Sequence, residues 1–167
     1  NTGGGSVNLK WLGELAYQGD TDPYAAMDRE VRGQPVGATG VFYHPYINNA
    51  GVVAPFYDLA ARAQFTGLHV GASRATVARA VYEGIALSIL DCYSATPVSV
   101  AEVRLSGGAA RSPVLCQIVA DALGLPVLVP SGEETGAKGA AMVAGWGIGV
   151  YSSLAEAAER CVTVSHR

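Results

Sequence analysis

The sequence predicts a single α/β domain, and three observations support this fold class. Residues 103–130 have the order strand, glycine turn, helix, strand, which is the pattern of a βαβ unit with parallel strands. Residues 74–93 repeat apolar side chains at three- and four-residue spacing, as a long helix against a core does. The chain has 167 residues, of which 50% are hydrophobic, and this is enough to bury one core.

Composition excludes several classes of partner. The net charge of −3 and the lack of Lys/Arg clusters argue against nucleic acid and acidic membrane surfaces. No run of about eighteen apolar residues is present, so no membrane span is expected. The three cysteines lie in apolar helical contexts and predict reduced residues of a cytoplasmic protein, not a disulfide framework or a metal site. Because the chain starts at Asn1 without a methionine, we expect a piece of a longer protein.

The first forty residues predict one helix and a loop. A glycine run at residues 3–5 leads into a helix that carries Trp11, Leu12 and Leu15. Residues 19–40 are rich in Gly, Pro, Asp and Thr, so they are predicted to be a loop-rich connection.

A short strand is predicted at residues 41–43, followed by a long irregular loop over residues 44–56. Its prolines and asparagines explain the irregularity without a function, although such loops are often binding loops. Ser73 then caps the long helix, in which Gly84 and Ser88 would let a neighbouring element approach closely. We expect Glu83 to be a solvated acid.

The glycine turn is the first candidate site. Gly107 and Gly108 lie where a strand over residues 103–105 ends and a helix over residues 114–123 is about to begin, with Ser112 as its N-cap. In open α/β sheets ligands bind at such a junction, because backbone without side chains permits close approach and helix N–H groups face the ligand. A tight turn that only needs positive φ explains the same glycines, and both interpretations remain open.

The last third of the chain predicts a strand and two helices. Residues 126–130 form the second strand of the βαβ unit, and residues 135–146 form a helix with many small residues. Such a composition is expected where another element packs very close. Ser153 and Glu156 have the spacing of a capping box that opens a last helix to about Arg160.

Four segments together resemble the FGGY carbohydrate kinases. Residues 63–68 (AQFTGL) with residues 76–83 (TVARAVYE) are similar to the family's second signature, from which Thr76 departs. Residues 106–109 (SGGA) resemble its adenosine-binding motif, and residues 134–141 resemble its Glu-x-x-Ala-Leu-Gly-Ala-Ala helix, with Lys138 in place of leucine. Residues 8–11 are similar to the turn before the first helix of the family's C-terminal domain.

This resemblance implies a ribonuclease-H-like, actin-like ATPase fold. Residues 1–167 would be the C-terminal FGGY-type domain, the second lobe of a two-lobe kinase, without the N-terminal lobe and the extreme C-terminus. The activity implied is phosphorylation of a sugar or polyol hydroxyl with ATP and Mg²⁺ in the cytoplasm. The family's general base and phosphate loop lie outside this chain, so we expect no catalytic residue here and no activity from the isolated fragment.

The resemblance also implies site residues. Gly107, Gly108 and Ala109 would line the adenosine pocket, and Arg111, Gly5 and Lys10 would lie near further nucleotide contacts. The loop that begins at Asn48 and Asn49 lacks the family's usual Glu–Arg pair, as in members that act on pentuloses and polyols. We therefore expect these two asparagines on the substrate side. No metal ligand is expected.

Two other classes of function remain open. The chain could be a non-catalytic, actin-like nucleotide-binding module that acts through assembly or a partner, or an α/β domain without a ligand. For the kinase, the expected partners are a small sugar or polyol, the N-terminal lobe and a second copy in a homodimer. A Gly-x-Asp hairpin upstream of Asn1 would favour the kinase over both alternatives.

Overall fold

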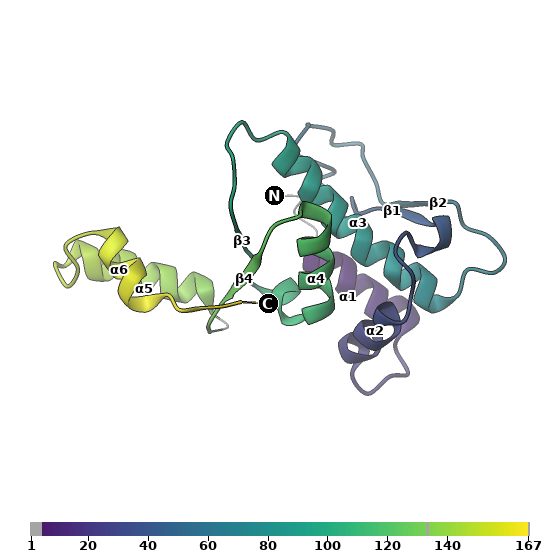
Figure 1. The fold of residues 1–167 in the computed structure, drawn as a ribbon, viewed down its shortest axis with the longest axis horizontal. Coiled ribbons are helices and arrows are strands. Elements are labelled where there is room, and N and C mark those ends of the chain that lie inside the picture. The colour runs from purple at the N-terminus through teal and green to yellow at the C-terminus, as the bar shows by residue number, and fades with distance from the viewer. Residues whose placement is uncertain (1–4, 133, 167) are drawn as a thin grey trace.

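The computed structural model describes residues 5–132 and 134–166, which form a helical body and a projecting arm (Figure 1). The elements follow in chain order: α1 (Gly5–Ala16), α2 (Pro23–Arg32), η1 (Ala38–Gly40), β1 (Phe42–His44), β2 (Gln64–Thr66), α3 (Arg74–Ser94), β3 (Val103–Arg104), η2 (Gly108–Arg111), α4 (Pro113–Leu123), β4 (Val127–Pro130), α5 (Thr135–Gly147), α6 (Leu154–Cys161) and β5 (Val164–His166).

Helix α3 is the centre of the body, because α1, α2, α4 and β1 all pack against it. Ser73 caps this helix, as predicted, by accepting a hydrogen bond from the amide of Thr76 at 3.1 Å. At Gly84 the strand β1 crosses so closely that an added Cβ would lie 2.3 Å from the carbonyl oxygen of Tyr43. The predicted close approach at this glycine is therefore confirmed.

The predicted βαβ unit is present. Strands β3 and β4 are parallel, with Val103 opposite Val127, and α4 connects them. Ser112 caps α4 by accepting from the amide of Leu115 at 3.0 Å, and Gly124 ends the helix in the left-handed conformation with φ of 64°. A third strand that the sequence did not predict, β5, pairs antiparallel with β4.

The prediction of a loop over residues 19–40 is wrong for α2. Asp22 caps this helix, since its carboxylate accepts from the amides of Tyr24 (3.1 Å) and Ala25 (3.0 Å), and Pro23 occupies the first helical position. The helix buries Met27 against the core. Further along the chain, β2 was also missed, and it pairs antiparallel with β1.

Glu83 is not the solvated acid that the sequence predicted. Its side chain is 16% exposed, and its carboxylate accepts from Arg79 Nε at 2.7 Å, one helical turn earlier. The same oxygen accepts from the amide of Gly37 at 3.0 Å. The two donors, the Arg79 guanidinium on the same helix and the Gly37 amide from a distant turn, together explain how this carboxylate can be partly buried.

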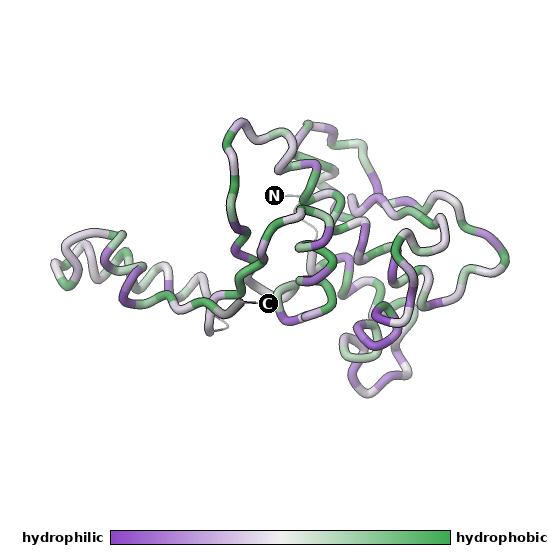
Figure 2. The backbone as a smooth tube through the Cα atoms, in the orientation of Figure 1, coloured by the Kyte–Doolittle hydropathy of each residue, from purple (hydrophilic) through white to green (hydrophobic). Residues whose placement is uncertain are grey.

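The arm consists of α5 and α6, which lie against each other and extend away from the body (Figure 1). None of the described residues of α5 is buried, and Figure 2 shows apolar stretches along the arm, with Trp146 and Ile148 among its exposed side chains. Of the helical glycines of α5, Gly145 alone shows the close packing that the composition predicted, since an added Cβ there would lie 2.7 Å from the ring of Tyr151. At Gly136, Gly139 and Gly147 no described atom lies within 4 Å of an added Cβ.

Helix α6 begins at the predicted cap. The Ser153 hydroxyl accepts a hydrogen bond from the amide of Glu156 at 3.1 Å. The Glu156 carboxylate in turn accepts from the amide and the hydroxyl of Ser152, whereas in a standard capping box it would accept from the amide of Ser153. Over residues 5–132 and 134–166, none of the helices is both long and apolar enough to cross a membrane.

Candidate functional site

The fold requires a glycine at position 107 but not at position 108. Gly107 has φ of 80° and ψ of −164°, a conformation that is essentially restricted to glycine. Gly108 does not have a positive φ. Among the described atoms, a Cβ on Gly108 would contact only the Cβ of Ser6, at an ordinary 3.5 Å. The explanation by positive φ therefore holds for Gly107 and fails for Gly108, whose missing side chain leaves space for a ligand.

Two cavities meet at this turn. The first has a volume of about 490 Å³, and its wall comes from α1, α2, α3 and the segment that precedes α4; its polar lining includes Ser6, Asp22, Asp28, Tyr82, Arg111 and Ser112. The second, of about 430 Å³, lies at the carboxyl ends of β3 and β4, and its polar lining includes Ser106, Arg111, Ser131 and Glu134. Gly108 and Arg111 line both cavities.

A hydrogen-bond network fixes the wall of the first cavity. Oδ1 of Asp28, on α2, accepts from the hydroxyl of Tyr82 (2.8 Å) and from that of Ser112 (2.6 Å). The Ser112 hydroxyl in turn accepts from the amide of Leu115, so its proton is directed at Asp28. Burial of Tyr82, together with the neighbouring carboxylate, raises the pKa of its hydroxyl far above the ordinary value. Tyr82 is therefore a neutral, permanent donor at physiological pH.

The charged side chains of each cavity indicate which ligand groups it favours. Asp22 and Asp28 place two carboxylates on the first cavity, which favours donor groups and disfavours phosphate. The second cavity has one carboxylate, that of Glu134, beside hydroxyl groups and backbone at the ends of two parallel strands, and Arg111 lines both cavities. An elongated ligand with an uncharged ring system at one end and an anionic group at the other matches this pair of cavities.

The structure brings three of the predicted nucleotide-site residues together, namely Gly107, Gly108 and Arg111. Ala109 lies in η2, partly buried against the core, and Gly5 begins α1, directly before Ser6 on the first cavity. The glycines at positions 3 and 4 lie outside the described residues.

The remaining predicted residues lie elsewhere. Lys10 pairs with Glu14 across one turn of α1, at 3.8 Å, and faces a different hollow of about 330 Å³. Asn48 and Asn49 form a turn that is closed by a hydrogen bond from the amide of Gly51 to the carbonyl of Asn48, and they line neither of the two cavities. The roles of Lys10 and of both asparagines stay predictions.

Sequence reasoning missed Asp28 and Tyr82. Asp28 lies in the stretch that was interpreted as a loop, so no helix was available to orient it. The signal that could have found it is the pair Asp22-Pro23, an N-cap followed by the proline of a first helical turn. Across the described part of the chain, no group of three or more His, Cys, Asp or Glu side chains could hold a metal ion.

Comparison with known proteins identifies the family. The model of "FGGY family of carbohydrate kinases, C-terminal domain" matches residues 2–148. An erythritol kinase of Brucella abortus is 36% identical over 162 residues, which are 90% of this chain and 30% of the kinase. A glycerol kinase of Bordetella parapertussis is 44% identical over 111 residues, which are 64% of this chain and 22% of that protein.

Solved structures show the same fold. Xylulose kinase from Rhodospirillum rubrum is 28% identical with a TM-score of 0.73, over 97% of this chain and 32% of that one. Ligand-bound xylulose kinase from Lactobacillus acidophilus is 23% identical with a TM-score of 0.81, over 96% of this chain and 32% of that one. The chain thus spans about a third or less of these proteins, and the predicted ribonuclease-H-like, actin-like fold is confirmed. The chain belongs to the FGGY family of carbohydrate kinases and corresponds to the C-terminal domain of that family.

Proposed function

We propose that this chain is the nucleotide-binding lobe of a cytoplasmic kinase that transfers the terminal phosphoryl group of ATP to a hydroxyl of an acyclic polyol or a pentulose. The observation that carries the proposal is Gly108, which borders both cavities and whose missing side chain the fold itself does not require. The relatives named erythritol kinase and glycerol kinase favour a polyol as the acceptor.

In this proposal the residues of the chain bind and orient the nucleotide. The nucleoside occupies the first cavity, against the backbone at Gly108, and the phosphates extend past Arg111, away from the carboxylates of Asp22 and Asp28. Positioning of this kind supplies much of the catalysis in phosphoryl transfer. Mg²⁺ is part of the proposal through its affinity for the phosphates of ATP. The described residues do not offer it a cluster of three or more His, Cys, Asp or Glu ligands.

The other partners are proposals as well. Since the relatives are about three times as long as this chain, an N-terminal lobe would contribute the general base and the phosphate loop. The polyol would bind between the lobes, with Asn48 and Asn49 on its side of the cleft.

The test compares Gly108→Val with Gly124→Ala in the complete gene product. Valine at position 108 places two methyl groups in the nucleotide path, so ATP affinity should fall about ten- to hundredfold while polyol affinity changes much less. Gly124 has φ of 64° and lies outside both cavities, so alanine there should cost about 1–2 kcal/mol of stability through strain alone. ATP and polyol affinities are measured well below the melting temperature of each variant.

Two results would contradict the proposal. If Gly108→Val binds ATP as the wild type does, the glycine pair only makes a turn. If the wild-type protein binds ATP but phosphorylates none of erythritol, glycerol and xylulose, a non-catalytic nucleotide-binding module becomes the better interpretation.

A further inference from the structure

Asp28 uses only one of its two carboxylate oxygens within the fold. Both hydroxyl donors, from Tyr82 and Ser112, reach Oδ1, at 2.8 and 2.6 Å. Within residues 5–132 and 134–166, no donor reaches Oδ2. Every buried side-chain nitrogen and oxygen of these residues has a hydrogen-bond partner, so Oδ2 is not buried. Since Asp28 lines the first cavity, Oδ2 is available to a ligand there.

The network makes this oxygen a rigid acceptor. Tyr82 is fully buried, and its hydroxyl donates to Oδ1 of Asp28, which favours the present rotamer of Asp28. Ser112 is held by its second role as the N-cap of α4. Asp22, the other carboxylate of this cavity, also accepts through Oδ1 alone, from the backbone amides of Tyr24 and Ala25, but its side chain is exposed whereas Asp28 is partly buried. Both carboxylates of the wall therefore have an oxygen that accepts no bond from the described residues, and Asp28 is the one that two side-chain donors orient.

We propose that Asp28 is a specificity-determining residue for the nucleoside, whose N–H or O–H group donates a hydrogen bond to Oδ2. This inference rests on the proposed function, because it assumes that the nucleoside occupies the first cavity. An ionised acceptor requires a donor from the ligand and disfavours both a carbonyl and a phosphate. Two parts of ATP offer such donors, the 6-amino group of adenine and the ribose hydroxyls.

The test is Asp28→Asn in the complete gene product, with ATP, ITP, 2′-deoxyATP and 3′-deoxyATP as probes in titration calorimetry. Asparagine is isosteric and keeps one oxygen for Tyr82 and Ser112, but it turns the second acceptor into an NH₂ donor. Loss of a charge-assisted hydrogen bond should weaken ATP binding by about ten- to hundredfold.

The pattern across the four nucleotides identifies the donor. If Asp28 accepts from the 6-amino group, ITP, which has a carbonyl there, should bind the variant as well as or better than the wild type. If Asp28 accepts from the ribose, ATP and ITP should weaken alike, and the affected deoxynucleotide should not. Asp22→Asn is the matched control, because it removes one charge from the same cavity and keeps the helix cap. It should change all four affinities by one common factor.

The inference is overturned if Asp28→Asn leaves the four affinities unchanged or scales them equally. The wild type provides a second measurement that does not depend on folding of the variant. It should bind ATP about tenfold or more tightly than ITP or than one deoxynucleotide, and equal binding of all four overturns the inference. A wild type that binds none of them contradicts the proposed function itself.

Discussion

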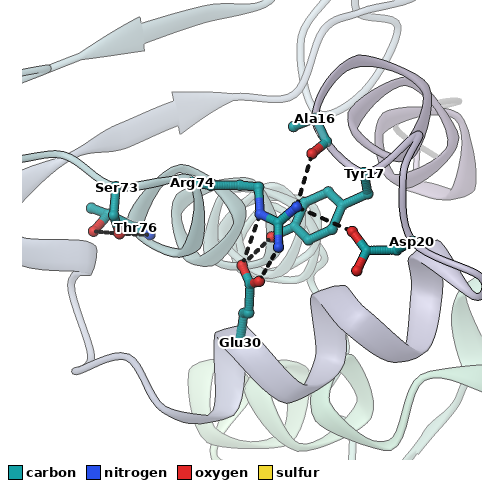
Figure 3. Close-up of polar contacts among 7 residues, drawn as sticks. All are labelled: Ala16, Tyr17, Asp20, Glu30, Ser73, Arg74 and Thr76. Atoms are coloured by element: carbon teal, nitrogen blue, oxygen red, sulfur yellow. Dashed lines mark hydrogen bonds and ion pairs between the residues drawn. The ribbon is translucent and has the colours of Figure 1, made fainter.

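At the scale of single residues, Arg74 joins three helices (Figure 3). Its guanidinium lies 4.1 Å from the centre of the Tyr17 ring and donates to the carboxylates of Asp20 (3.1 Å) and Glu30, and to the carbonyl of Ala16 (3.2 Å). The first residue of α3 is thereby tied to the end of α1 and to α2. Cation–π and bidentate contacts of this kind depend on the planar guanidinium.

This cluster predicts a pH dependence. Hydrogen bonding from Arg74, then from the Tyr17 hydroxyl, lowers the pKa of Glu30 below its ordinary 4.5. The unfolded state therefore binds the proton more readily, so the stabilisation is complete above the ordinary pKa and is lost as the pH falls through the lowered one. In urea denaturation, wild type and Arg74→Gln should differ by a constant free energy of unfolding above about pH 5.5, and by less as the pH falls below 4.5.

Arg104→Gln is the control for this experiment. Arg104 pairs with Glu102 at 2.9 Å on the surface, where both side chains are well exposed, and such pairs contribute little. The free energy of unfolding of Arg104→Gln should differ little from that of the wild type at every pH. A difference for Arg74→Gln that does not change with pH would show that the Glu30 carboxylate is not held by this contact.

Local residue chemistry could be predicted from the sequence, and long-range pairing could not. Ser73 and Ser112 serve as caps where they were expected, because each acts on backbone within a few residues. Glu83 and Asp28 were not recognised as buried or oriented, because each has a partner more than forty residues away. A contact between residues so far apart leaves no periodic pattern in the sequence.

At the scale of elements, the crossing of β1 over α3 predicts an unusual effect of a helical Gly→Ala change. Alanine in a helix interior is normally about 1 kcal/mol more favourable than glycine. At Gly84, however, the new Cβ would lie 2.3 Å from the carbonyl oxygen of Tyr43, so strand or helix must shift. Overpacking of this kind costs about 1–3 kcal/mol. Gly84→Ala should therefore lower the free energy of unfolding, measured by urea denaturation.

Gly139→Ala is the matched control, because this glycine is also helical but no described atom lies within 4 Å of an added Cβ. It should leave stability unchanged or raise it by up to about 1 kcal/mol. Equal gains from both substitutions would mean that β1 does not press on α3 at this position.

The two strands that the sequence missed share one physical reason. β2 and β5 have three residues each, and they are strands only because β1 and β4 lie beside them. Too short to show an alternating pattern, they depend on partners that lie far along the chain. α2 was missed for a different reason, since its Asp-Pro start was interpreted as turn chemistry. The long α3 and the βαβ unit, by contrast, have periodic patterns that any helix or buried strand must show.

At the scale of the whole molecule, stability is concentrated in the body. The buried side chains of α1–α4 and of β1, β3 and β4 form one core, whereas α5 contributes none of its described residues to it. Segments with few buried contacts open with free energies well below that of global unfolding. We therefore expect the amides of α5 to exchange with deuterium at least about tenfold faster than those in the middle of α3.

Native-state hydrogen exchange with mass spectrometry tests this expectation on the chain itself. Peptides from α3 provide the internal reference in the same sample, so no variant is needed. Equal protection of α5 and α3 would show that the arm and the body unfold as one cooperative unit.

The two ends of the arm have a topological consequence. The chain leaves the body at Ser131 and returns at Thr163, and these residues are joined by a hydrogen bond of 2.8 Å from the Ser131 amide to the Thr163 carbonyl. Immediately beside them, Pro130 pairs with Val164 in the sheet. The arm is thus an excursion whose entry and exit coincide, so a change in its length would not require a change in the register of β4.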